Sequence, residues 1–377
     1  MINVKGLTSL ILNKDLILQG LANSLPSKSG QFVDWTGVIY PEGSFPILPV
    51  EPFTDLDPAE FGDGFRAGVN EWMAFGIAAK LASAQSLPAT IVELGASQGL
   101  WCISWVKYFQ RVWPTIPTIA LGVEAADAGD ETLKFWKANS DLEFLAEIRS
   151  NQIILQGSNW KFHWLRRAVS HQIGNHWFPK VDITKDNGRH VSAETDLNLE
   201  IFDEVRSITP QEISLKLRKL ESYRISLLHL DLQGSELKLL ESDQFDSLIS
   251  IADVIMLGTH SREIELKAHL RLRETHTLLL SEPCEFASQP NYSGLVKDGE
   301  QLWINNNVLI IAGDLGLINV SSINMEEILA EYRLKVTESR KAKGVLETIK
   351  SGLPKLLIRV HLFGIARTIW RIIHRNN

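Results

Sequence analysis

An α/β fold with a mostly parallel sheet is what the order of apolar segments along this chain predicts. Short strand-like runs alternate with helix-like stretches, and this alternation is typical of parallel crossover units. The 377 residues are 45% hydrophobic and 22% charged, a mixture that can bury a core and that excludes a disordered or collagen-like chain. The expected domain spans residues 65–315, between an N-terminal extension at 1–64 and a helical basic C-terminal tail at 316–377.

The first half of that domain supplies a helix followed by three strands. From Phe65 to Ala84, apolar residues recur at spacings of three and four, as in an amphipathic helix. The elements expected after it are a strand at Ala89–Leu94, a turn at Gly95–Gly99, a helix at Leu100–Phe109, a strand at Thr118–Glu124, a helix at 131–149 and a strand at 160–169.

The second half supplies two further pairs of strand and helix and then a hairpin. The expected elements are a strand at Ile225–Asp231, a helix at Glu236–Leu248, a strand at Ile249–Leu257, a helix at Glu263–Arg273, and strands at Thr277–Leu280 and Gln301–Ile311. The last two strands are joined by a long turn-rich loop without a clear helix. They predict an antiparallel hairpin at the edge of the sheet.

Charge and cysteine content narrow the function classes. The net charge of −7 argues against nucleic acid as a partner. The two cysteines, Cys102 and Cys284, match no zinc or disulfide spacing, so we expect a reducing, cytoplasmic location. No signal peptide is evident, and no run of 18 apolar residues indicates a membrane span.

The two ends of the chain carry separate signals. The extension at 1–64 is rich in aromatic and proline residues and predicts a surface arm packed on the domain, or a cap over a site. Residues 335–377 contain ten Lys or Arg against two Glu, a net charge of +8. Apolar and basic residues are interleaved at 353–375, as in an amphipathic helix that binds an anionic membrane surface, a partner protein or its own domain.

The clearest signal for a ligand is the loop Gly95-Ala-Ser-Gln-Gly99, which directly follows a strand. Glycines let a backbone approach a ligand closely, and the next helix begins with unpaired N–H groups. The dinucleotide fingerprint would need glycine at 97 and glycine or alanine at 100, where this chain has Ser97 and Leu100. Hydride transfer is therefore disfavoured. A turn whose glycines only ease packing is the alternative interpretation.

A second acid stands at the end of the next strand. S-adenosylmethionine sites begin with an acid, a loop of small residues and a second acid after the following strand, where a carboxylate can accept both ribose hydroxyls. Glu93 and Glu124 occupy these two positions. The pair favours S-adenosylmethionine as the cofactor over a purely structural turn.

Several linked motifs resemble the FkbM-type S-adenosylmethionine-dependent methyltransferases, over about residues 65–312. They are Val92-Glu-Leu-Gly-Ala-Ser-Gln-Gly99, Gly122-Val-Glu124, Arg167-Ala-Val-Ser170, Leu230-Asp-Leu-Gln-Gly-Ser-Glu236, Gly258-Thr-His-Ser-Arg262, and Asp298-Gly-Glu-Gln-Leu-Trp303 with Asn305. The resemblance implies a class I methyltransferase fold, which is Rossmann-like with a seven-stranded, mostly parallel sheet. It also implies methylation of a hydroxyl on a carbohydrate or another hydroxylated metabolite.

The expected site has a cofactor part and an acceptor part. The cofactor part consists of Glu93, Gly95, Ala96, Ser97, Gly99, Glu124, Ala168 and Asp231. Ligands meet the carboxyl ends of parallel strands, where Asp231 and His260 would emerge. We expect neutral His260 to be the general base, and Asp231 to orient it or to contact the acceptor or cofactor. Ser261, Arg262 and Glu236 are expected to contact the acceptor.

These side chains also have plain structural interpretations. His260 could bond to a nearby backbone group, Asp231 could cap a turn, and Glu236 could be a first-turn acid favoured by the helix dipole. Gln233 stands where the family usually has glutamate, and this leaves few oxygen ligands for a divalent metal, which is therefore not favoured. The same departure motivates an alternative function, a catalytically weak methyltransferase-like module that binds a glycan or a membrane-associated assembly.

Overall fold

The computed structural model describes residues 11–18, 21, 32–34, 36–40, 67–139, 141–180, 201–289 and 292–319. Between Leu12 and Asn319 these residues belong to one compact unit. Most of the extension at 1–64 and the tail beyond 319 lie outside the described residues, and so does the amphipathic helix expected at 353–375. Within the described part of the chain, no helix is long and apolar enough to cross a membrane.

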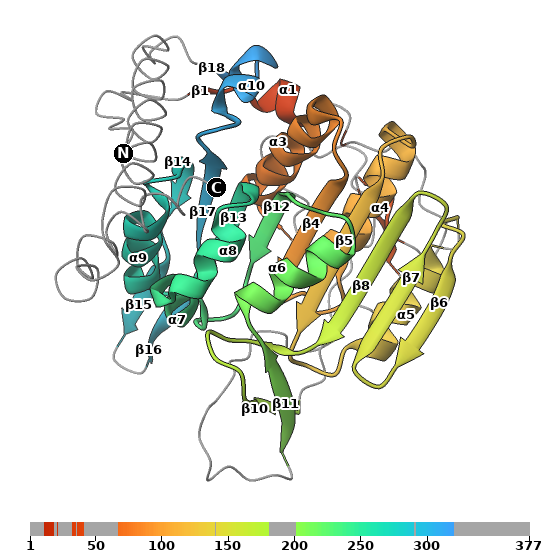
Figure 1. Ribbon diagram of the computed structural model, residues 1–377. Coiled ribbons are helices and arrows are strands. Elements are labelled where there is room, and N and C mark those ends of the chain that lie inside the picture. The colour runs from red at the N-terminus through yellow and green to blue at the C-terminus, as the bar shows by residue number, and fades with distance from the viewer. Residues whose placement is uncertain are drawn as a thin grey trace, which may run out of the picture. The chain divides into compact units, whose positions relative to one another are not determined.

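A nine-stranded mixed sheet forms the centre of the unit (Figure 1). Its strands are β4 (Ala89–Leu94), β5 (Thr118–Glu124), β6 (Leu145–Arg149), β7 (Gln152–Gln156), β8 (Trp160–Arg166), β12 (Ile225–Leu230), β13 (Ala252–Thr259), β14 (His276–Glu282) and β17 (Gly299–Asn305). Their order across the sheet is β14-β17-β13-β12-β4-β5-β8-β7-β6. The strands from β13 to β8 are parallel, and the pairings outside them are antiparallel. The predicted α/β class is confirmed, whereas the predicted seven-stranded sheet has nine strands.

Helices cover both faces of the sheet. They are α3 (Val69–Gln85), α4 (Leu100–Val112), α5 (Gly129–Ala138), α6 (Pro210–Lys219), α7 (Glu236–Glu241), the 3-10 helix η1 (Asp243–Phe245), α8 (Asp246–Ile249), α9 (Arg262–Leu272) and α10 (Leu309–Asp314). Helices α6 to α9 bury their apolar residues against one face, where Val92, Leu94 and Leu230 lie. Figure 1 shows α6 and α8 lying over this face. Successive strand residues point to opposite faces, so Glu93 lies on the other face, beneath α4.

Local sequence explains where α6 and α9 begin. Thr209 accepts the N–H of Glu212, whose carboxylate accepts the N–H of Thr209, and this capping box starts α6. Ser261 starts α9 by accepting the N–H of Ile264 at 3.1 Å. The central strands are buried along their whole length, which is why they read as continuous apolar runs.

The edges of the fold differ from the sequence prediction. The helix expected at 131–149 ends at Ala138, and β6 and β7 follow as a hairpin closed by the two-residue turn Ser150-Asn151. This hairpin accounts for the two additional strands. The strand expected at 160–169 divides at Arg167, whose N–H bonds to the carbonyl oxygen of Glu124, so that β9 (Ala168–Val169) leaves the main sheet.

Strand β9 belongs to a small three-stranded sheet that the sequence did not predict. Its other strands are β10 (Asn175–Pro179) and β11 (Phe202–Ile208), in the order β10-β11-β9. The expected helix at Glu236–Leu248 is divided into α7, η1 and α8. The predicted hairpin at the sheet edge is confirmed as β14 and β17, but β17 ends at Asn305 and is followed by α10. The segment between β14 and β17 forms a further hairpin of β15 (Glu285–Gln289) and β16 (Tyr292–Lys297).

The described ends of the unit lie against the domain. Short elements there are β1 (Ile11–Leu12), α1 (Lys14–Leu18), β2 (Phe32–Val33), β3 (Ile39–Tyr40) and β18 (Ile318–Asn319). Helix α1 packs so closely on α3 that a Cβ at Gly76 would touch Ile17. The Asn139 side chain accepts the N–H of Ile39 at 2.8 Å and donates to its carbonyl oxygen at 3.0 Å. These described parts of the extension therefore pack on the domain as an arm.

Candidate functional site

The carboxyl ends of the parallel strands gather the chemistry of this chain. Glu93 and Glu124 lie at the ends of β4 and β5, and Asp231 and His260 directly follow β12 and β13. Strand β17 runs in the opposite direction, so its amino-terminal end, preceded by Asp298, reaches the same edge of the sheet. The predicted Glu93, Glu124, Asp231 and His260 are thus brought together at one edge.

The glycine loop is shaped by three residues with positive φ. These are Gly95 at +82°, Ser97 at +45° and Gly99 at +76°. A Cβ at Gly95 would collide with the carbonyl oxygen of Asp231, so only glycine lets the loop cross the end of β12. A Cβ at Gly99 would lie 3.2 Å from the ring of Phe162. The loop geometry therefore depends on Gly95 more than on Gly99.

Glu124 ties this loop to the end of β5. Its Oε2 accepts the N–H of Ser97 at 2.7 Å, and its Oε1 accepts the N–H of Ala126 at 2.7 Å. The side chain is 9% exposed. Burial raises the pKa of Glu124, although the hydrogen bonds from Ala126 and Ser97 oppose this. Each carboxylate oxygen has a second lone pair, so the group can still accept hydroxyls from a ligand.

The neighbouring cofactor residues have less direct positions. Ala96 is buried, and its N–H bonds to the carbonyl oxygen of Val123 at 3.0 Å. Ala168 is fully buried in β9. The preceding residue, Arg167, bonds through its N–H to the carbonyl oxygen of Glu124 at 2.7 Å, and this places the start of β9 beside the end of β5. The backbone of Ala96 therefore ties the loop to β5, and Ala168 follows the residue whose N–H bonds to Glu124.

Glu93 is used within the protein. Its carboxylate accepts the N–H of Cys102 at 3.1 Å and that of Trp101 at 3.4 Å, and it thereby caps the first turn of α4 from beneath. The side chain is 3% exposed, and burial raises its pKa to about 7. The expected direct contact with a cofactor is therefore not available to the Glu93 carboxylate in this arrangement, because the start of α4 covers it.

A pair formed by buried His229 and half-buried Glu71 lies next to Glu93, and the sequence prediction missed it. His229 on β12 places Nε2 3.4 Å from Oε1 of Glu71, in the first turn of α3. Burial alone would lower the pKa of His229, but Glu71 and Glu93 raise it. Only the fold joins Glu71 to His229, 158 residues later in the chain. The pair anchors the start of α3 to the end of β12.

His260 is held between two carboxylates. Its Nε2 lies 3.2 Å from Oδ1 of Asp231, and its Nδ1 lies 3.4 Å from Oε1 of Glu236. The imidazole is 5% exposed. Burial opposes the charge, yet the two carboxylates raise the pKa of His260 to about 10. The predicted role of a neutral general base does not fit these surroundings, because both carboxylates favour the charged form of the imidazole.

Asp231 is the accessible member of this group. Its side chain is 42% exposed, and Oδ1 also accepts a hydrogen bond of 2.8 Å from the Gln233 amide. Burial would raise the pKa of Asp231, but His260 lowers it below its ordinary value. Asp231 is therefore an ionised acceptor of hydrogen bonds that faces outward, as the predicted contact with an acceptor or cofactor requires.

The three residues expected to contact an acceptor are positioned otherwise. Glu236 is fully buried, and its carboxylate accepts the N–H groups of Leu232 and Gly234, which closes the turn between β12 and α7. The Ser261 hydroxyl caps α9. Arg262 is 61% exposed and pairs with Glu265 at 3.0 Å. Glu236 and Ser261 therefore have the structural roles of helix and turn caps, and Arg262 forms an ion pair at the surface.

Asp298 is a further site residue that the sequence prediction did not select. Its Oδ1 lies 3.8 Å from Nε2 of His260, and its side chain is 55% exposed. Burial raises its pKa, and the charges of Asp231 and Glu236 raise it further, while His260 opposes them. Its place immediately before an antiparallel strand is the sequence signal that could have identified it, because such a strand begins at the carboxyl edge of its parallel neighbours.

A metal could be held by three of these groups. Asp231, Glu236 and His260 each offer one ligand atom, and these atoms lie within 4.8 Å of one another. The Glu236 oxygens already accept two backbone N–H groups, and Gln233 donates to Asp231 instead of adding a carboxylate. These hydrogen bonds occupy carboxylate oxygens that a metal would otherwise use, and the expectation that a metal is not favoured stays a prediction.

Comparison of the chain with protein-family models and with curated proteins finds no match. The interpretation of the site therefore rests on its geometry and on its motifs.

Proposed function

We propose that this chain is an S-adenosylmethionine-dependent O-methyltransferase of the class I type, acting on a hydroxyl of a carbohydrate or another hydroxylated metabolite. The observation that carries the proposal is Glu124, a buried acid at the end of β5 that is bonded across to Ser97 of the glycine loop. In nucleotide-type sites, an acid accepts the ribose hydroxyls, and a glycine loop with positive φ lets the backbone approach the ligand closely. Glu124 and the loop provide these two features.

The strand order supports the same proposal. From β14 to β8 the sheet has five adjacent parallel strands, with one antiparallel strand, β17, inserted next to the edge strand β14. A mostly parallel sheet with an antiparallel hairpin at one edge is what the resemblance to the methyltransferases implies. In this interpretation β6 and β7 are an addition at the opposite edge of the sheet, beyond β8.

The residues of the loop fit S-adenosylmethionine. Oε1 of Gln98, a residue of the loop itself, is buried without a hydrogen-bond partner among the described residues. Such an acceptor is satisfied when a ligand brings hydroxyl or ammonium donors. Glu124 and Gln98 would hold the cofactor, whose sulfonium supplies the electrophilic methyl group.

The acid cluster supplies the acceptor chemistry. Protonated His260 holds Asp231 ionised, and Asp231 orients the acceptor by accepting a hydrogen bond from a hydroxyl next to the reacting one, whose own O–H is directed at Asp298. Asp298 receives the proton as the new C–O bond forms and the carbon–sulfur bond breaks, because its raised pKa makes it the more basic of the exposed carboxylates. In this assignment His260 is a positioning residue.

A transfer assay tests the proposal. The full-length protein is incubated with S-adenosylmethionine and a panel of hydroxylated sugars and glycosides, and S-adenosylhomocysteine formation is measured. Turnover that needs both cofactor and acceptor is the expected result. An acceptor that binds while no S-adenosylhomocysteine forms would instead favour the alternative of a non-catalytic, glycan-binding module.

A further inference from the structure

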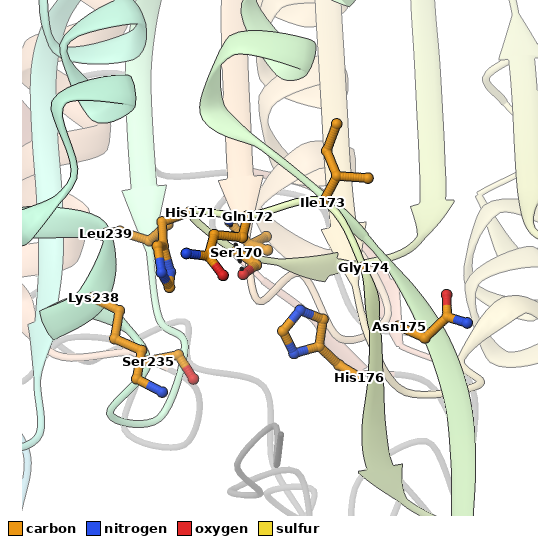
Figure 2. Close-up of a pocket in the computed structure, with 11 residues that line it drawn as sticks. Ser170, His171, Gln172, Ile173, Gly174, Asn175, His176, Ser235, Lys238 and Leu239 are labelled. Atoms are coloured by element: carbon orange, nitrogen blue, oxygen red, sulfur yellow. Dashed lines mark hydrogen bonds between the residues drawn. The ribbon is translucent and has the colours of Figure 1, made fainter. Parts of the chain in front are cut away.

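A pocket of about 310 Å³ lies beside the acid cluster, and none of the roles described above uses it. It opens between residues 169–176, which run from the end of β9 to the start of β10, and the start of α7 (Figure 2). Ser235, which lines it, belongs to the same turn as Asp231, so the pocket and the proposed reaction centre share the turn between β12 and α7. Its volume suits a group of the size of a monosaccharide.

The pocket is lined by basic side chains on two sides. His171 lies between β9 and β10, His176 lies on β10, and Lys238 lies on α7. Figure 2 shows both imidazoles and the Lys238 side chain around the same space, whereas Ile173 points away from it. Among the described residues that line the pocket, none is Asp or Glu. This lining contrasts with the carboxylates on the other side of the shared turn.

Hydrogen bonds fix the segment that carries the two histidines. The buried Ser207 hydroxyl on β11 accepts the N–H of Gly174 at 2.7 Å and lies 2.9 Å from the carbonyl oxygen of Gln172. The N–H of Ser170 bonds to the carbonyl oxygen of Ile208 at 3.1 Å. The histidines are therefore presented by a backbone that is bonded to β11 on both sides of His171, and the pocket is preformed.

Basic side chains around the pocket lie close enough to affect one another's protonation. Burial lowers the pKa of His176, and the charges of Lys238 and His171 lower it further. Burial likewise lowers the pKa of Arg167; Arg206 on β11 lowers it further, and Glu212 opposes this. Cations that depress one another's proton affinity in this way attract a bound anion, which relieves their repulsion.

We propose that this pocket binds an anionic group, a phosphate or a carboxylate, carried by the methyl acceptor. Histidine and lysine donors on opposite walls match the oxygens of such a group, and the volume leaves room for a sugar ring beside it. The assignment of the anion to the acceptor rests on the proposed methyltransferase function. It makes the substrate class a phosphorylated sugar or a uronic acid, with the anion in the pocket and the reacting hydroxyl across the turn at Asp231.

Titration calorimetry without S-adenosylmethionine tests the pocket itself. The probes are glucose 1-phosphate, glucuronate and uncharged glucose, and the proteins are the wild type, Lys238→Ala, His176→Gln and the control Lys134→Ala on α5. We expect one or both anionic sugars to bind and glucose to bind at least tenfold more weakly. Lys238→Ala and His176→Gln should each weaken binding of the anion by about tenfold, as expected for loss of one charge-assisted contact. Lys134→Ala should have no effect.

The arms of the experiment separate the possible failures. The stronger of the two anionic probes identifies the group, and equal binding of glucose by the wild type would overturn the proposal. Anion binding that Lys238→Ala and His176→Gln leave unchanged would also overturn it, because the anion would then bind elsewhere. A parallel titration with S-adenosylmethionine distinguishes the two proposals. Cofactor binding without anion binding contradicts only the pocket, whereas anion binding without cofactor binding contradicts only the methyltransferase.

Discussion

Replacing His260 by glutamine tests whether this histidine is a cation that holds the site together. Its imidazole is 5% exposed and lies 3.2 Å from Asp231 and 3.4 Å from Glu236. Glutamine removes the positive charge and keeps a polar side chain of similar reach. The two carboxylates then face each other without the cation between them, and the folded protein should lose stability.

The size of the effect follows from the pKa. A group whose pKa is raised in the folded protein adds stability that is complete below its unfolded pKa and is lost as the pH rises through the folded value. For His260 these values are 6.5 and about 10. A tenfold change in proton affinity corresponds to about 1.4 kcal/mol, so the contribution is of the order of 4 kcal/mol at pH 7 and less than about 1 kcal/mol at pH 10.

Urea unfolding in the presence of EDTA, followed by tryptophan fluorescence, measures this difference. We expect His260→Gln to be less stable than the wild type by a few kcal/mol at pH 7, and the gap to close towards pH 10. His269→Gln, at an exposed position on α9, is the matched control and should show no such dependence on pH. Equal stability of the wild type and His260→Gln at pH 7, or a difference in stability that does not change with pH, would refute the assignment of a positive charge to His260.

Three further predictions concern the loop, the base and the metal. Gly95→Ala combines a positive φ with a collision at Asp231 and should lower the free energy of unfolding by about 2–5 kcal/mol in urea. Gly129→Ala, whose Cβ would meet its nearest atom at 3.7 Å, is the control and should cost less than about 0.5 kcal/mol. Asp298→Asn should lower kcat by about a hundredfold and leave the Kd for S-adenosylmethionine unchanged, and equal rates would exclude Asp298 as the base. Mn²⁺ or Mg²⁺ should leave the melting temperature of the wild type unchanged at pH 7, since Glu236 is occupied by backbone N–H groups; a rise of several degrees would reveal a metal site.

The buried centre of the fold was predictable because its signals are local. Strands β4 and β5 run over the predicted residues, since a strand buried on both faces is a continuous apolar run. The turn between β4 and α4 was marked by Gly95 and Gly99, both of which have positive φ. At the edges the signal weakens. Every residue of β6 is exposed, and its polar and apolar residues resemble the continuation of a helix.

The placement of Asp231 and His260 was predictable, but their surroundings, including Asp298, were not. Sequence position placed Asp231 and His260 at the carboxyl edge of the sheet, where the structure brings them together. The charge of His260 depends on Glu236, which approaches it only because the turn between β12 and α7 folds back. The pair of His229 and Glu71 joins residues 158 positions apart, and no spacing in the sequence indicates such a contact.

The pocket beside the site illustrates the same limit. His171 and His176 lie in a segment without regular spacing, and Lys238 follows more than 60 residues later. Strand β11 brings the segment to the edge of the sheet by bonding it through Ser207. Long-range pairing of this kind leaves no local pattern, so the pocket could be found only in the folded protein.

Titration calorimetry of the full-length protein with S-adenosylmethionine and S-adenosylhomocysteine measures whether the glycine loop and Glu124 bind this cofactor. We expect micromolar binding that Glu124→Ala weakens by at least about tenfold, because the carboxylate that would accept the ribose hydroxyls is removed. Glu147→Ala, which removes an exposed acid on β6, should bind as the wild type does. Circular dichroism establishes that both variants are folded. The absence of binding by a folded wild-type protein, or equal binding by Glu124→Ala, would contradict the proposed cofactor site.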